Sequence, residues 1–157
     1  MDLLFCDAPI GRLGLVGEGD SLISLALPYA PVPLIMERET PVLREAKRQL
    51  EAYFAGKLRR FDLPLRMAGT PFQSKVWEQL QQIPYGQTVS YRELARRVGQ
   101  PGASRAVGGA NRRNPIPIIV PCHRVIAADS TLGGYSGNCG GSADVKRALL
   151  RLEGLNF

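Results

Sequence analysis

The stretch TVSYRELARRVGQPGASRAVGGANRRN, residues 88–114, carries the signals of two short helices joined by a tight turn. Ser90 stands at an N-cap position and Glu93 follows three residues later, which is the capping-box arrangement. Gln-Pro-Gly at 100–102 predicts a turn, and a second helical segment follows it. Two short helices around a glycine-containing turn, over about residues 90–113, predict a helix-turn-helix. A basic helical pair on the protein surface has the same pattern, so this stretch alone leaves both interpretations open.

The excess of basic residues lies in the half of the chain that contains this pattern. The protein has 157 residues and a formal net charge of +6. Residues 1–69 contain nine Lys or Arg and nine Asp or Glu, whereas residues 70–157 contain eleven and five. A neutral half joined to a basic half indicates a scaffold attached to a polyanion binder, and nucleic acid is the commonest polyanion.

Residues 1–69 carry the signals of a small β-sheet and one helix. Three short apolar runs separated by Gly, Asp and Pro predict a hairpin or meander at 3–8, 11–19 and 21–28. A Thr-Pro pair at 40–41 predicts the start of a helix, with Gly56 as its C-cap. The run RRFDLPLRM, residues 59–67, is expected to be an edge strand because it contains Pro64.

A second Thr-Pro pair at 70–71 opens another helical pattern, which ends near residue 83. We therefore place a domain boundary between an α/β domain, 1–69, and a mainly α domain, 70–157. A final helix is expected over about 143–154.

The run IPIIVPCHRVIAAD, residues 116–129, places a cysteine and the only histidine of the chain side by side in an apolar setting. Cysteine attacks as the thiolate, and its ordinary pKa is about 8.5, so a reactive cysteine needs a group that takes its proton. Neighbours in an extended strand point to opposite faces, so a direct Cys122–His123 contact requires a bend, and otherwise the proton passes through a water. Glu153 is a candidate partner for the other ring nitrogen of His123. A small buried cysteine beside a structural histidine is the alternative.

The composition argues against a metal centre and against a membrane protein. Three cysteines without a CxxC pair, together with one histidine, do not supply a zinc site, and we expect no metal. The N-terminal residues lack a signal-peptide pattern, and no apolar run approaches the length of a membrane span. We expect a soluble protein that is intracellular and cytoplasmic.

Several motifs resemble the O6-alkylguanine-DNA alkyltransferases, also called methylated-DNA–protein-cysteine methyltransferases. The segment VPCHRV is similar to the Pro-Cys-His-Arg motif of this family. The runs PYGQTVSYRELARRVG, ASRAVGGANRRNPIPI, GGYSG and LLRLEG stand in the family's order and cover nearly all of residues 70–155. Residues 1–69 match in outline only. The resemblance implies a ribonuclease-H-like α/β domain followed by a winged helix-turn-helix domain.

The resemblance also implies a reaction and a partner. The alkyl group of O6-alkylguanine, with O4-alkylthymine as a further substrate, would pass irreversibly from a flipped-out base to Cys122 in a single turnover without a cofactor. The protein would bind double-stranded DNA through the minor groove as a monomer, without a membrane, and would associate with the nucleoid when bound to DNA.

Site residues follow from the same resemblance. Cys122 would be the alkyl acceptor, with His123 as a base acting through water and Glu153 polarising the histidine. Asn114 would stabilise the bend before the active-site segment. Tyr91 would assist base flipping and donate to the ring nitrogen of the departing guanine.

The lesion pocket and the DNA contacts complete these expectations. Ser136 would hydrogen bond O6 of guanine, Tyr135 would line the pocket, and Arg105 would enter the duplex in place of the flipped nucleotide. The second helix of the pair would supply the remaining contacts: Ala106, Gly108, Gly109, Arg112 and Arg113. The two glycines disfavour a helix by about 1 kcal/mol each relative to alanine, which is justified where another backbone comes close. That backbone is either nucleic acid, which the resemblance favours, or a neighbouring helix.

One departure and three rival functions remain. The Gly-rich loop at 137–142, which contains Cys139, is longer than in relatives, and a tolerated surface insertion is its simplest explanation. A lesion binder that flips alkylguanine without repairing it is the first rival, although such proteins lack the acceptor cysteine. A winged-helix transcription regulator is the second. A cysteine hydrolase is the third, and the chain lacks a second histidine for it.

Overall fold

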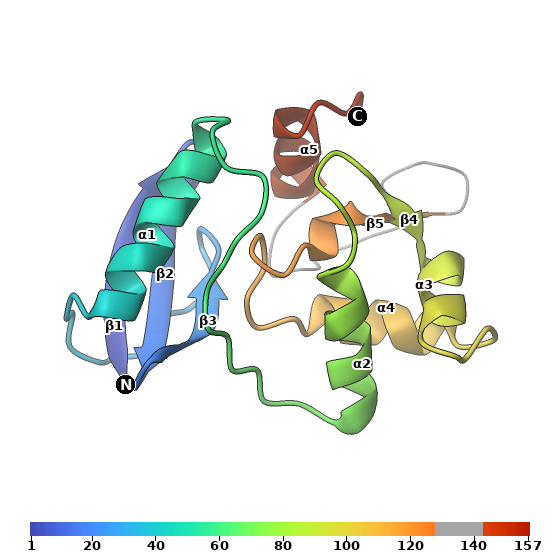
Figure 1. Ribbon diagram of the computed structural model, residues 1–157, viewed down its shortest axis with the longest axis horizontal. Coiled ribbons are helices and arrows are strands. Elements are labelled where there is room, and N and C mark those ends of the chain that lie inside the picture. Colours follow the sequence, from blue (N-terminus) through green and yellow to red (C-terminus); the bar gives the residue numbers. More distant parts are fainter. Residues whose placement is uncertain (128–142) are drawn as a thin grey trace. The chain divides into compact units, whose positions relative to one another are not determined.

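A three-stranded antiparallel sheet with one helix across it forms the first part of the chain (Figure 1). The strands follow the order β1-β2-β3, with bounds β1 Asp2–Ala8, β2 Gly11–Glu18 and β3 Ser21–Ala26. The computed structural model describes residues 1–127 and 143–157, and it divides into two units, Met1–Ala68 and Gly69–Phe157. The meander predicted from the three apolar runs is confirmed.

Helix α1 (Pro41–Phe54) covers the sheet with an apolar face. The hydroxyl of Thr40 accepts a hydrogen bond from the backbone N of Leu43 at 3.4 Å, as expected of an N-cap. The C-cap is Ala55 and not Gly56, which follows it at a φ of 76° and so supplies the left-handed residue that ends the helix. The buried face of α1 includes Leu43, Ala46, Leu50 and Tyr53.

The predicted edge strand at 59–67 is wrong. This segment lies beside β3, but it makes a single parallel bridge, between Leu22 and Leu65. The backbone N of Leu22 donates to the carbonyl of Pro64 at 2.9 Å, and the N of Arg66 donates to the carbonyl of Leu22 at 3.0 Å. Toward the start of β3 the next bond of a parallel ladder would need an N–H from Pro64, which has none, so the pairing cannot extend in that direction.

The second unit begins with α2 (Pro71–Leu80), whose start follows the predicted Thr-Pro pattern. Thr70 and Gln73 form a reciprocal capping box, in which each side chain bonds the backbone N of the other residue. Trp77 of this helix is 2% exposed, and its Nε1 donates to the carbonyl of Ala110 at 2.9 Å. That bond ties α2 to the later helix α4.

The predicted helical pair is α3 (Tyr91–Arg97) and α4 (Ser104–Arg112). The hydroxyl of Ser90 accepts from the backbone N of Glu93 at 3.0 Å, as predicted. In the part of the chain that the structure describes, however, the Glu93 carboxylate bonds Arg96 and Arg97 and not the backbone of Ser90. Glu93 thus forms only half of the predicted capping box.

The remaining elements surround this pair. Strands β4 (Val89–Ser90) and β5 (Val125–Ile126) form a short parallel pair, η1 (Cys122–Arg124) is a single 3₁₀ turn, and α5 (Ala143–Leu152) is the last helix. The expectation of a small sheet with a helix followed by a mainly helical part is confirmed. No helix within the described ranges is both long enough and apolar enough to cross a membrane.

Candidate active site and DNA-binding helix

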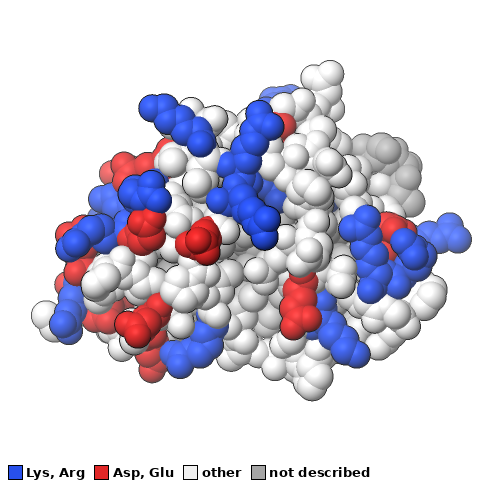
Figure 2. Space-filling view, viewed as in Figure 1, with Lys and Arg blue, Asp and Glu red and all other residues white. Residues whose placement is uncertain are grey.

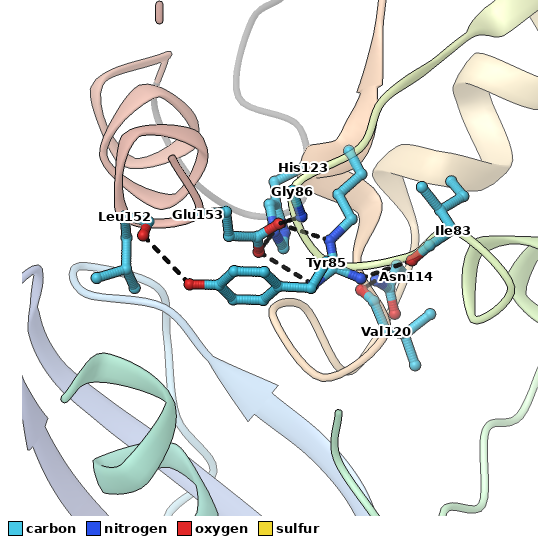
Figure 3. Close-up of polar contacts among 9 residues, drawn as sticks. Ile83, Tyr85, Gly86, Asn114, Val120, His123, Leu152 and Glu153 are labelled. Atoms are coloured by element: carbon cyan, nitrogen blue, oxygen red, sulfur yellow. Dashed lines mark hydrogen bonds and ion pairs between the residues drawn. The ribbon is translucent and has the colours of Figure 1, made fainter. Parts of the chain in front are cut away.

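Asn114 fastens the segment that leads from α4 to Cys122. Its Oδ1 accepts from the backbone N of Ile116 at 2.9 Å. Its Nδ2 donates to the carbonyl of Val120 at 2.8 Å (Figure 3). Asn114 is only 6% exposed, so both bonds are shielded from water. Within this loop Ile118 has a φ of 73°, which a β-branched residue rarely adopts. A tightly determined loop therefore precedes the cysteine.

Cys122, His123 and Arg124 form the 3₁₀ turn η1, so the backbone bends where the sequence left a strand or a bend open. The backbone N of Cys122 donates to Val120 at 2.8 Å, and the N of Arg124 donates to the carbonyl of Pro121 at 3.0 Å. Strand β5 begins only at the next residue. All three side chains of the turn are buried.

The carboxylate of Glu153 lies at the centre of this buried site and accepts hydrogen bonds from three described residues, His123, Arg124 and Gly86 (Figure 3). His123 Nε2 lies 2.7 Å from Glu153 Oε2. Arg124 donates through Nε to Oε1 at 2.8 Å and through Nη2 to Oε2 at 3.1 Å. The backbone N of Gly86 donates to Oε1 at 3.0 Å. Arg124 is held further by a 2.7 Å bond from Nη1 to the carbonyl of Ile83, so histidine, arginine and glutamate form one fixed unit.

The charges of this unit assign the protonation of His123. Burial alone would raise the pKa of Glu153, but His123 and Arg124 outweigh it and hold that pKa well below its usual range. Burial lowers the pKa of His123, against the opposing effect of Glu153. A neutral His123 must donate from Nε2 to the carboxylate, which leaves Nδ1 as its basic nitrogen. Nδ1 is buried and has no hydrogen-bond partner in the described part of the structure.

Tyr91 opens α3 and is surrounded by polar groups from other elements. Burial raises the pKa of Tyr91 above its ordinary value, and the nearby charge of Arg112 and side chain of Asn111 offset that rise only in part. Lys146 of α5 lies 5.8 Å from the centroid of the Tyr91 ring and donates from Nζ to the carbonyl of Val125 at 2.6 Å. Burial lowers the pKa of Lys146 to about 8. Helices α4 and α5 therefore both bring cations toward this phenol.

Helix α4 exposes basic and small residues together. Arg105, Ala106, Arg112 and Arg113 are exposed. A Cβ added at Gly109 would meet no atom within 4 Å, and one added at Gly108 would meet only the Tyr91 ring, at an ordinary 3.8 Å. Packing against a neighbouring helix therefore does not explain the two glycines within the described residues.

Basic side chains also gather on α3. Figure 2 shows Lys and Arg side chains over the position of this helix, with a carboxylate among them. The Glu93 carboxylate pairs there with Arg96 and Arg97, and both pairs are partly exposed.

Sequence reasoning missed three buried polar residues of the site: Asn111, Arg124 and Lys146. The sequence could have indicated a buried ion pair at Arg124, because a charged residue in an apolar run needs a buried partner. Asn111 and Lys146 had none, because polar residues on a short helix are usually exposed.

Tyr135, Ser136, Cys139 and the loop 137–142 lie outside the described residues. No group of three or more His, Cys, Asp or Glu that could hold a metal occurs in the ranges 1–127 and 143–157.

Two family models match the two parts of the chain. Residues 4–67 match the model described as 6-O-methylguanine DNA methyltransferase, ribonuclease-like domain. Residues 71–155 match the model described as 6-O-methylguanine DNA methyltransferase, DNA binding domain.

Relatives named methylated-DNA–protein-cysteine methyltransferase resemble the chain over nearly its full length. The constitutive methylated-DNA–protein-cysteine methyltransferase of Bacillus subtilis is 45% identical over 96% of this chain and 94% of its own. The corresponding protein of Mycobacterium leprae is 51% identical over 94% of this chain and 88% of its own. A crystal structure of Mycobacterium tuberculosis OGT in complex with DNA superposes with a TM-score of 0.88, at 48% identity over 98% of this chain and 92% of that one.

Proposed function

Because the chain belongs to the 6-O-methylguanine DNA methyltransferase family, we propose that it repairs DNA by moving the alkyl group of O6-alkylguanine onto Cys122. The sulfur attacks the alkyl carbon, a C–S bond forms, and the bond from that carbon to O6 breaks with its electron pair going to the purine. The thioether product is stable and no second nucleophile is needed, so each protein molecule acts once. O4-alkylthymine is a further substrate of the same chemistry.

The His123–Glu153 pair beside Cys122 is the observation that carries this proposal. The bond at 2.7 Å fixes the tautomer of the histidine and leaves Nδ1 as a base next to the acceptor residue. Since Nδ1 has no hydrogen-bond partner among the described residues, we assign the transfer of the thiol proton to a bridging water. The resulting imidazolium is stabilised by Glu153, whose anionic form is already favoured by Arg124.

The substrate reaches this buried site only if its base leaves the stacked duplex. O6 lies inside the helix, and extruding the nucleotide costs a few kcal/mol. We assign α3 and α4 to a winged helix-turn-helix whose second helix enters the minor groove. Arg105, exposed near the start of α4, fills the gap that the base leaves, while Arg112 and Arg113 offset phosphate charge.

The small residues of α4 support this orientation. Since no part of the described chain needs Gly108 or Gly109 for its own packing, their lack of a side chain is explained by close approach of the DNA backbone. Ala106 lies on the same helix and is exposed.

Tyr91 gives the departing purine its proton. Guanine leaves as an anion unless a donor meets its ring nitrogen, and the phenol of Tyr91 lies near the start of α3 within reach of α4. Ser136 and Tyr135 are assigned to the O6 side of the pocket on the family's pattern.

The first unit acts as a scaffold of ribonuclease-H-like topology. The protein works as a monomer in the cytoplasm and joins the nucleoid when it binds DNA. Turnover needs neither a metal nor an organic cofactor, because the thiolate and the substrate supply every bond that changes.

Incubation of the reduced protein with a duplex containing O6-methylguanine, followed by peptide mass analysis, tests the proposal. One methyl group is expected on the peptide that contains Cys122, saturating at one transfer per protein, with the Cys6 peptide unmodified. The Cys122→Ser variant is expected to bind the duplex without removing the methyl group. Repeated turnover, or lesion binding with Cys122 unmodified, would overturn the proposal and favour a hydrolase or a lesion binder.

A further inference from the structure

Arg124 is a buried cation that bonds both oxygens of the Glu153 carboxylate. Its side chain is 7% exposed, and that of Glu153 is 0% exposed. Nε donates to Oε1 at 2.8 Å and Nη2 donates to Oε2 at 3.1 Å, so the planar guanidinium lies side-on against the carboxylate. Oε2 is also the oxygen that lies 2.7 Å from His123 Nε2. The histidine and the arginine therefore share one oxygen of the glutamate.

Contacts from outside the turn fix the position of this guanidinium. Its Nη1 donates to the carbonyl of Ile83 at 2.7 Å. The guanidinium carbon lies 5.8 Å from the centroid of the Tyr85 ring. The hydroxyl of Tyr85 in turn donates to the carbonyl of Leu152 at 3.2 Å, next to the glutamate in the chain (Figure 3). The segment after α2 and the end of α5 thus both hold Arg124 against Glu153.

The charges of the three bonded side chains balance while the histidine is neutral, and this balance depends on Arg124. Arginine stays protonated throughout the physiological pH range, so it compensates the Glu153 carboxylate permanently. Without Arg124, His123 alone would face a buried carboxylate. A buried charge is unfavourable unless an opposite charge or a proton compensates it. The pair of His123 and Glu153 would therefore take up one proton in the resting protein.

That added proton would leave Nδ1 of His123 protonated in either of two arrangements. In the first, an imidazolium with a proton on each ring nitrogen faces the carboxylate. In the second, a protonated Glu153 donates to Nε2, and the single ring proton lies on Nδ1. Nδ1 is the buried nitrogen without a hydrogen-bond partner among the described residues, and the proposed reaction needs it as a base. A histidine in either arrangement could not accept the proton of Cys122.

Other titratable groups also act on His123, but among the cations Arg124 has the larger effect. Burial lowers the pKa of His123 most, and Glu153 opposes this. The charges of Arg124 and, to a smaller extent, Lys146 of α5 lower that pKa further. Lys146 donates from Nζ to the carbonyl of Val125 at 2.6 Å. The direct bonds between Arg124 and Glu153 thus agree with its electrostatic effect on the histidine.

We propose that Arg124 is a positioning residue that keeps Nδ1 of His123 unprotonated at rest, so that the histidine can accept the proton of Cys122. The inference rests on the proposed function and adds a residue to it. In the step itself the thiol proton moves through water to Nδ1, and the electron pair of the S–H bond stays on sulfur. Thiolate, imidazolium, carboxylate and guanidinium then carry no net charge, as the four groups did before the step.

The protonation of His123 can be observed directly, because it is the only histidine of the chain. Nitrogen NMR of the reduced, histidine-labelled protein without DNA is expected to show Nδ1 unprotonated and Nε2 protonated at pH 7. Arg124→Gln keeps a hydrogen-bond donor but removes the charge, so its Nδ1 is expected to be protonated at pH 7. Arg124→Lys keeps the charge but not the planar fork, and its Nδ1 is expected to stay unprotonated.

Single-turnover methyl transfer from an O6-methylguanine duplex, measured against pH, gives the kinetic readout. The rate is expected to fall on acidification as Nδ1 gains its proton. For Arg124→Gln this fall is expected about one to three pH units above that of the wild type, and for Arg124→Lys close to it. A purely structural role would lower the rate of a variant by the same factor at every pH.

Folded and unfolded molecules give separate ring signals, so a partly unfolded variant still reports on its folded fraction, and the wild-type signals test the proposal without any variant. A protonated Nδ1 in the resting wild type, the same state of Nδ1 in both Arg124 variants, or a loss of rate that does not depend on pH would each overturn it. The ring signals need no substrate. Wild-type protein with the expected signals that leaves Cys122 unmethylated would therefore contradict the proposed function instead.

Discussion

Removing the charge of Glu153 tests how much the buried unit of histidine, arginine and glutamate contributes to the free energy of unfolding. In Glu153→Gln the side chain keeps its shape but loses one acceptor oxygen and its negative charge. Among the described residues, the native carboxylate accepts one hydrogen bond from His123, two from Arg124 and one from Gly86. A glutamine oxygen accepts two at most, and its NH₂ faces groups that are themselves donors.

The larger effect comes from Arg124. The Arg124 side chain is 7% exposed, and its guanidinium would lose its counter-ion while remaining buried. Breaking a buried pair by removing one partner costs about 3–5 kcal/mol. Since a whole domain is stable by only about 5–15 kcal/mol, the variant is expected to lose a large part of the stability of the second unit.

Equilibrium urea unfolding at pH 7, followed by circular dichroism, measures this loss. The matched control is Glu93→Gln, which also removes a carboxylate that pairs with arginines, but on an exposed surface, so its transition is expected to move far less. Replacing Arg124 with Met in the Glu153→Gln background is expected to recover part of the loss, because no unpaired buried charge remains. Equal shifts for the two single variants, or no recovery in the double variant, would refute the reasoning.

Gly109→Ala is expected to raise the free energy of unfolding by up to about 1 kcal/mol, since the added Cβ meets no described atom within 4 Å. The same variant is expected to weaken duplex DNA binding in a titration; unchanged DNA affinity would contradict close backbone approach. Lys146 has its pKa lowered from 10.5 to about 8, so the unfolded chain binds more protons between these values and stability rises with pH there. The free energy of unfolding of Lys146→Met, relative to that of the wild type, is therefore expected to be greatest below pH 8. This relative stability is expected to fall by up to about 3 kcal/mol by pH 10.5. A relative stability that stays constant with pH would exclude a charged, buried Lys146. Arg105→Ala is expected to slow repair of duplex DNA strongly while leaving the reaction with free O6-alkylguanine unchanged, as single-turnover rates on both substrates would reveal; equal losses would exclude a role in base extrusion.

Helix starts could be predicted from the sequence because their signals are local. The Thr-Pro pairs at 40–41 and 70–71 and the serine at 90 each stand directly before a helix in the structure. The strand at 59–67 failed because pairing depends on which N–H groups face a partner far along the chain, and Pro64 supplies none. The 3₁₀ turn at Cys122 also depends on distant contacts, through the loop that Asn114 closes.

Residue types and the family's motifs predicted some contacts of the site but not all of them. His123 and Glu153 could be paired in advance because a base needs an acceptor on its second nitrogen, and the structure has them in contact. The sequence could not predict that Arg124 and Gly86 also donate to this carboxylate, because spacing along the chain does not show how many donors converge on one buried group. Asn111 was missed for the same reason, since the carbonyl that it bonds, that of Cys122, belongs to another element.

The indole of Trp77 is the only one in the chain, and it is buried with its N–H bonded to the carbonyl of Ala110 on α4. Intrinsic tryptophan fluorescence therefore originates in one place, inside the second unit. Emission excited near 295 nm follows the unfolding of that unit alone, whereas the tyrosines and the backbone signal of Met1–Ala68 contribute to other probes. The same fluorophore senses movement of the last turn of α4, so stopped-flow emission can time the engagement of DNA in the native protein without an attached dye.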